Sequence, residues 1–168
     1  MRSIYKIVVC SLLTLSITSC EKDLLEKEQY QKEIYLIGAY NRVWTTEVSY
    51  SNEEVKTYFT VSSSGTLALD RDVNVKMKIN EELVDIYNKK YWTVLNEDKY
   101  YKSLDTDLYS IPSLENTVIK HAEGISTEVP VLIKTASLKI DQSYVIPVEI
   151  ESTTGYPVST SGYKMLVL

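Results

Sequence analysis

Apolar and polar residues alternate with a period of two along most of the chain. The clearest example is "DVNVKMKIN", in which Val73, Val75, Met77 and Ile79 share one face and polar residues occupy the other. This alternation predicts a half-buried β-strand. Because one strand cannot bury its apolar face alone, the pattern requires paired neighbours and an opposing layer.

Six further segments are short and rich in β-branched or aromatic residues. They are Ile34 to Ile37, Val55 to Ser62, Thr117 to His121, Val129 to Lys134, Tyr144 to Ile150 and Tyr163 to Leu168. Pro130 and Pro147 fall inside two of them. Since proline cannot donate a ladder hydrogen bond, we expect an edge strand or a bulge at each proline.

One segment, "NEELVDIYNKKYW", changes the period from two to that of a helix. Asn80 is a suitable N-cap, acids follow it, and lysines come late, as the helix dipole favours. We therefore expect one short helix near 81–91 that crosses from one sheet to the other. The predicted fold class is mainly β, a β-sandwich of about seven to eight short strands.

The stretch "LLTLSITSC EKD" shows an apolar run that ends at a cysteine and then becomes charged. Arg2 and Lys6 with this run form the layout of a secretory signal that is too short to span a membrane. Its end, Ile17 to Cys20, resembles the lipobox of bacterial lipoproteins. We expect a signal peptide at 1–19, lipid attachment at Cys20 and a charged tether at 20–32; the alternative is a plain secreted protein with an incidental cysteine.

Charge and cysteine content narrow the function classes. The net charge is −5 and becomes more negative when the signal is removed, which argues against a nucleic-acid partner. Of the two cysteines, Cys10 leaves with the signal and Cys20 carries lipid, so neither a disulfide nor a thiolate metal site is expected. We expect no metal and no cofactor, and a single domain at 33–168 that depends on its hydrophobic core.

Several segments together resemble a known family. The lipobox, "DVNVKMKIN", "LVDIYNKKY", "YSIPS", "VPVLIK", "SYVIPVEIESTTGYPVS" and "YKMLVL" resemble, in their order, lipoproteins of gut-type Gram-negative anaerobes with the domain of unknown function 1735. The resemblance covers about residues 30 to 168. It implies an immunoglobulin-like sandwich, a position at the front of larger surface proteins encoded among glycan-uptake genes, and no catalytic residues. With the lipobox, it implies lipid anchoring in the outer membrane, facing the cell exterior.

The residues themselves offer little for catalysis. His121 is the single histidine, and acids such as Glu81 and Glu82 are adjacent in sequence, which on a strand places them on opposite faces. We therefore expect that the protein is not an enzyme.

Tyrosine is in large excess over phenylalanine, with 14 Tyr and 2 Trp against 1 Phe. This excess suggests rings that reach the surface with a hydrated hydroxyl group. Trp92, Tyr100, Tyr101 and Tyr109 lie among acids and amides and are candidate ligand-binding residues, because sugar C–H faces stack on such rings. The alternative is that these rings close the helix onto the core and line a strand.

Two function hypotheses follow. The first is a non-enzymatic cell-surface lipoprotein that acts as a glycan-binding or spacer module of a polysaccharide acquisition system. The second is a structural or adhesive lipoprotein that pairs with another surface protein through an edge strand near Pro130 or Pro147. In both, the lipid on Cys20 makes the membrane a partner.

Overall fold

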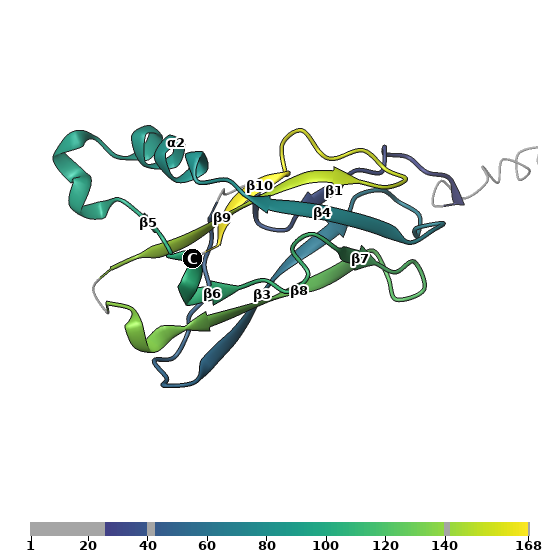
Figure 1. Cartoon of the computed structure of the whole chain (residues 1–168). Coiled ribbons are helices and arrows are strands. Elements are labelled where there is room, and N and C mark those ends of the chain that lie inside the picture. The colour runs from purple at the N-terminus through teal and green to yellow at the C-terminus, as the bar shows by residue number, and fades with distance from the viewer. Residues whose placement is uncertain (1–25, 40–42, 140–141, 168) are drawn as a thin grey trace, which may run out of the picture.

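The computed structural model describes residues 26–39, 43–139 and 142–167, and their strands form two facing sheets (Figure 1). The first sheet has the order β1 (Ile34–Leu36), β3 (Glu54–Ser63), β8 (Ser126–Lys134) and β6 (Tyr109–Ser110). The second has the order β2 (Val43–Trp44), β10 (Lys164–Val167), β9 (Tyr144–Thr153), β4 (Val73–Ile79) and β7 (Thr117–Ile119), and β5 (Lys102–Ser103) pairs with β9.

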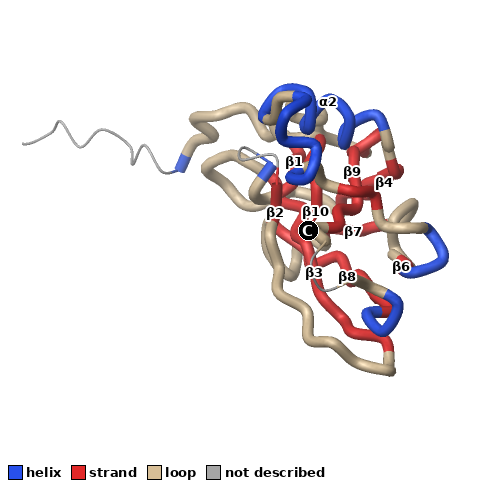
Figure 2. The backbone as a smooth tube through the Cα atoms, turned by 90° about the vertical axis from the view of Figure 1, so that its left-hand side faces the viewer, coloured by secondary structure: helices blue, strands red, loops and turns tan. Residues whose placement is uncertain are grey.

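The described residues form one α-helix, α2 (Glu82–Tyr91), and the 3-10 helices η4 (Val94–Lys99), η5 (Thr106–Leu108) and η6 (Thr135–Ser137). Figure 2 shows the helices outside the two strand layers. The predicted mainly β sandwich with one short helix is confirmed, and each of the seven predicted strands is present. The two-residue strands β2, β5 and β6 were not predicted.

The hydrophobic core lies between the two sheets. Val73, Val75 and Met77 of β4 are at most 1% exposed, whereas Lys76 and Lys78 between them are exposed, as the alternation predicts. Phe59 of β3 is fully buried in the same cluster. Burial of the β4 face alone contributes several kcal/mol, which is offset by the entropy of ordering the strand.

Pro130 lies on an edge, as expected. β8 pairs with β3 along its whole length, but β6 reaches β8 only at Leu132 and Ile133. The Thr60 carbonyl accepts from Ile37, so even-numbered residues of β3 turn their polar backbone groups away from β8. Tyr58 is therefore in a non-hydrogen-bonded pair with Pro130, whose nitrogen faces the outer edge where no ladder donor is needed.

Pro147 lies neither on an edge nor at a bulge, so the expectation of one or the other is wrong; the register shift in β9 falls between Ile150 and Ser152. Pro147 pairs with Leu166 in β9, a central strand between β10 and β4. Its carbonyl accepts from Asn80 at the end of β4, and the next carbonyl on the same side of β9, that of Val145, accepts from Leu104 after β5. The proline nitrogen thus faces the gap between the end of β4 and the start of β5, where the chain continues into α2. No hydrogen bond of the sheet is lost there.

The predicted signal peptide 1–19 and Cys20 lie outside the described residues. In the described part of the predicted tether, Glu28 forms an ion pair with Lys32, and its carboxylate accepts from the backbone N–H groups of Thr66 and Leu67. The tether therefore contacts the loop after β3. Within the described part of the chain, no helix has the length and apolar character needed to span a membrane.

Candidate functional site

Helix α2 begins close to the predicted position and covers the outer face of the second sheet. The expectation that it crosses from one sheet to the other is wrong, because β4 before it and β5 after it both pair with β9. The Asn80 side-chain oxygen accepts from the backbone N–H of Glu82 at 3.2 Å, which satisfies one of the free donors of the first turn. Glu82 and Asp85 lie in the first turn and Lys89 and Lys90 in the last, in the order that the helix dipole favours.

A second, smaller hydrophobic cluster lies beneath α2. It consists of Leu83 and Val84 of the helix with Val145 of β9 and Leu166 of β10. These residues face away from the main core, so the second sheet is buried on both faces where the helix covers it. The helix is thereby held in one position on the sheet.

Asn88 joins α2 to the segment before β5. Its side chain is 4% exposed; Nδ2 donates to the Tyr101 carbonyl at 2.9 Å, and Oδ1 accepts from the Tyr101 N–H at 3.0 Å. A buried amide that satisfies both backbone groups of one residue fixes that residue relative to the helix. Tyr101 is therefore positioned by the helix although it lies outside it.

Three tyrosine rings gather at this place. The Tyr87 ring lies 4.5 Å from that of Tyr91 and 5.5 Å from that of Tyr101, measured between centroids. The tilted arrangements are those that aromatic pairs favour. Tyr91 is 49% exposed, so the cluster reaches the surface.

A hollow of about 590 Å³ lies between α2 and the segment 97–103. We call it the acidic hollow, because carboxylates of Glu81, Glu82, Asp85 and Glu97 line it. Tyr100, Tyr101 and Lys102 also line it, and Ser103 donates to Glu81. Carboxylate, amide and phenol groups beside aromatic faces are able to bind hydroxyl-rich ligands.

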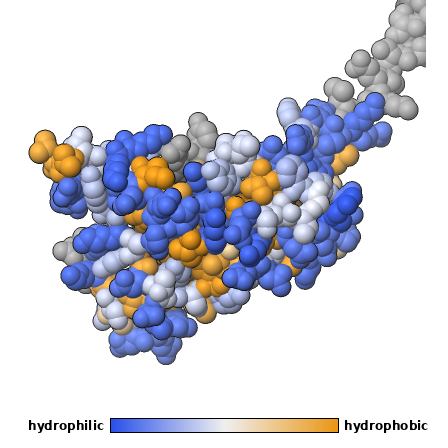
Figure 3. Space-filling model, turned by 45° about the horizontal axis from the view of Figure 1, so that its top comes forward, coloured by the Kyte–Doolittle hydropathy of each residue, from blue (hydrophilic) through white to orange (hydrophobic). Residues whose placement is uncertain are grey.

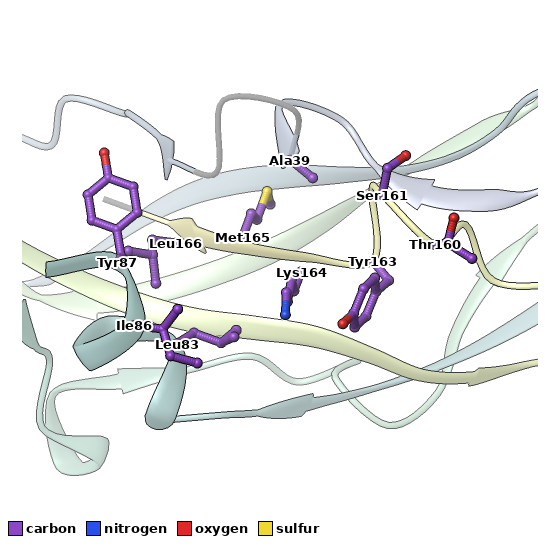
Figure 4. A pocket seen from close by; sticks show the side chains of 10 residues that line it. All are labelled: Ala39, Leu83, Ile86, Tyr87, Thr160, Ser161, Tyr163, Lys164, Met165 and Leu166. Carbon is purple, nitrogen blue, oxygen red and sulfur yellow. The ribbon is translucent and has the colours of Figure 1, made fainter. Parts of the chain in front are cut away.

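A second hollow of about 450 Å³ lies on the other side of α2, against β10. We call it the β10 hollow. Leu83 and Ile86 of the helix form one wall, and the segment from Thr160 to Leu166 forms the other (Figure 4). Both hollows have the size of small-molecule sites in proteins.

The structure brings together only some of the predicted ligand-binding residues. Tyr100 and Tyr101 line the acidic hollow, but Trp92 and Tyr109 line neither hollow. Lys99 lies 5.6 Å from the Trp92 ring, and the buried Trp92 Nε1 has no hydrogen-bond partner among the described residues.

Tyr109 lies in β6 of the other sheet and packs against the main core. Burial raises the pKa of its phenol above the ordinary value, and the negative charge of Glu81 adds to this.

Sequence reasoning missed the residues of the β10 hollow, above all Tyr163 and Lys164. Both belong to the final predicted strand, and no local pattern marks them as different from other strand residues. Their position beside α2 depends on the pairing of Lys164 with Glu149 in β9. A signal was present for Tyr87, which stands four residues before Tyr91 on the predicted helix.

The single histidine lies apart from both hollows. His121 is exposed after β7, and its Nδ1 lies 2.6 Å from Asp72 Oδ1, which lowers the Asp72 pKa. In the part of the chain that the structure describes, no group of three or more His, Cys, Asp or Glu side chains is arranged to hold a metal ion.

Residues 30–157, more than half of the chain, match a protein-family model described as "-like, N-terminal domain". The chain belongs to this family of N-terminal domains. Its structural neighbours include a Bacteroides ovatus multidomain protein that contains the domain of unknown function 1735, at 18% identity and a TM-score of 0.59, over 76% of this chain and 39% of that one. The predicted resemblance to this type of gut Bacteroides domain is confirmed. No curated protein matches the chain.

Two further solved structures share the fold of this N-terminal domain. One is a candidate carbohydrate-binding protein from Bacteroides ovatus, at 19% identity and a TM-score of 0.61, over 80% of this chain and 36% of that one. The other is EndoBT-3987 from Bacteroides thetaiotaomicron with a Man5GlcNAc product, at 18% identity and a TM-score of 0.55, over 80% of this chain and 30% of that one. The chain thus spans less than half of the length of these three structures.

Proposed function

We propose that the chain is a non-enzymatic glycan-binding or spacer module of a lipid-anchored outer-membrane protein that takes part in glycan acquisition. The observation that carries this proposal is the fold shared with the candidate carbohydrate-binding protein. Tyrosines and hydrogen-bonding side chains around two hollows at α2 supply suitable chemistry. The similarity to EndoBT-3987 fits the same role, because the chain spans only 30% of that structure.

Binding is tested with the soluble chain that starts at residue 20 and carries Cys20→Ser. We expect a glycan array followed by calorimetry to identify a ligand. Tyr100→Ala should weaken its binding if the ligand occupies the acidic hollow, and Lys164→Gln should do so if it occupies the β10 hollow. Tyr50→Ala is the matched control, since Tyr50 is 65% exposed and lines neither hollow. Lack of binding to the whole panel by a folded sample would contradict a glycan-binding role.

The second candidate, pairing with another surface protein, is favoured by one observation. Residues 126–131 of β8 form backbone pairs with β3 on one side, while β6 covers only Leu132 and Ile133 on the other. A partner strand would add at this edge, although Pro130 removes one donor from it. Stoichiometric co-purification of a protein from detergent-solubilised membranes, lost with a further proline at Glu128, would favour this candidate.

A further inference from the structure

Among the described residues that line the β10 hollow, Lys164 carries the one charged side chain, and the others are apolar or bear hydroxyl groups. Leu83, Ile86 and Leu166 supply apolar surface, and Thr160 and Ser161 supply exposed hydroxyl groups at its rim. Figure 3 shows one face of the molecule as mainly hydrophilic, with hydrophobic groups in separate places. The acidic hollow on the other side of α2 has the opposite character, since four carboxylates line it.

Lys164 has no carboxylate partner within ion-pair distance among the residues that the structure describes. Its nearest candidate is Glu149, which lies opposite it in the β9–β10 pairing. Glu149 instead accepts from Asn80 Nδ2 at 2.5 Å and forms an ion pair with Lys78 at 3.8 Å. In a chain with a net charge of −5, a half-buried lysine without a counter-ion is able to take an anionic group from a ligand.

An aromatic ring lies next to this charge. The Lys164 Nζ is 4.9 Å from the centroid of the Tyr163 ring, and the two side chains point to the same side of the strand (Figure 4). The cation and the ring together match a sugar that carries an acidic group. The C–H face of the pyranose would stack on Tyr163 while the anionic group binds the ammonium of Lys164.

From this arrangement we infer that the β10 hollow binds an acidic glycan, one whose sugars carry carboxylate or sulfate groups. The inference deepens the proposed function and rests on it. The hydroxyl groups of Thr160 and Ser161 would bind the sugar hydroxyls, and Ile86 and Leu83 would cover its apolar face. The acidic hollow is not expected to accept such a ligand, because its carboxylates repel it.

The test uses calorimetry on the soluble Cys20→Ser chain with three probes. These are oligogalacturonate, the same oligosaccharide with its carboxyl groups reduced to neutral galactose, and a chondroitin sulfate oligosaccharide. We expect an acidic probe to bind at least tenfold more tightly than the neutral one, and its binding to weaken as salt is raised from 50 to about 500 mM. Comparison of the first and third probes distinguishes carboxylate from sulfate as the recognised group.

Variants locate the site. Lys164→Gln should reduce the affinity for the acidic probe about tenfold, and Lys164→Arg should restore most of it because the charge is kept. Lys56→Gln is the matched control, since Lys56 Nζ also lies near a tyrosine ring, 5.0 Å from the centroid of Tyr58, but outside the hollow. Circular dichroism confirms that each variant is folded.

The outcomes separate this inference from the proposed function. If the neutral probe binds as tightly as the acidic ones, or if acidic binding survives in Lys164→Gln, the inference is overturned and the glycan-binding role stands. If the folded protein binds none of these probes, the inference is overturned as well, and a glycan array of neutral polysaccharides then decides the wider role.

Discussion

At the scale of single residues, the buried amide of Asn88 contributes most to the shape of the candidate site. Its two hydrogen bonds hold the backbone of Tyr101 against α2, and Tyr101 then lines the acidic hollow. The sequence indicated Tyr100 and Tyr101 as candidate ligand-binding residues, because they lie among acids and amides. It did not indicate which polar residue positions them, since Asn88 on a helix surface looks like any solvated side chain.

Replacement of Asn88 by Ala should lower the free energy of unfolding by about 2 kcal/mol, because two partly buried backbone groups of Tyr101 lose their partners. Urea denaturation measures this change. Asn96→Ala is the control, since Asn96 donates to Thr93 Oγ1 at 3.0 Å in an exposed turn, and it should change the stability by less than about 0.5 kcal/mol. Equal effects of both changes would show that the Asn88 bonds do not hold the segment.

Gly38 and Gly155 allow a second test at this scale, because both have φ near +85° but different neighbours. The φ values are 87° and 83°. A Cβ at Gly38 would lie 2.5 Å from the Trp44 ring, whereas a Cβ at Gly155 would lie 3.2 Å from the flexible Arg71 side chain. An alanine at either position therefore has the same backbone strain, and the two variants differ only in the contact of the new Cβ with the Trp44 ring.

Gly155→Ala should destabilise the protein by about 1–2 kcal/mol, the cost of a left-handed conformation for alanine. Gly38→Ala should cost about 1–3 kcal/mol more, because the Trp44 ring has to move. Urea denaturation gives the difference, and tryptophan fluorescence reports the ring. A Gly38→Ala protein as stable as Gly155→Ala would contradict the contact.

At the scale of elements, periodicity predicted each strand that is long enough to show it. β4 has the predicted bounds, Val73–Ile79, and β3 and β8 extend the predicted strands by one to three residues. β2, β5 and β6 have two residues each, which is too short for a periodic pattern, and their partners define them.

The error at Pro147 has a related cause. Proline is tolerated in a strand wherever its nitrogen, which has no hydrogen to donate, faces a side without a partner strand. In β9 the nitrogen of Pro147 faces such a side, the gap between β4 and β5. The sequence does not show at which residue a neighbouring strand ends. For the same reason, it did not place Lys164 beside α2, because the two meet through the register of β9 with β10.

At the scale of the whole molecule, the positions of the chain ends relate anchoring to binding. The described N-terminal residues and α2 lie at opposite ends of the sandwich (Figure 1). Between Cys20 and Glu28, which contacts the loop after β3, the chain can span at most about 30 Å. A lipid on Cys20 would therefore hold the N-terminal end near the membrane, with the acidic hollow at the α2 end that points away from it. The β10 hollow reaches from α2 to Thr160 and Ser161, beside β1.

This proposal requires that Cys20 carries the lipid. Each buried methylene contributes about 0.8 kcal/mol, and two or more acyl chains give stable anchoring. Cys20→Ser should therefore abolish labelling by radioactive palmitate and move the protein from the membrane to the soluble fraction of fractionated cells. Cys10→Ser is the matched control, because Cys10 lies inside the predicted signal peptide and the variant should keep both the label and the membrane location. Persistent labelling of Cys20→Ser, or an equal loss of label in both variants, would contradict lipid attachment at Cys20. Neither hollow would then have a required orientation relative to a membrane.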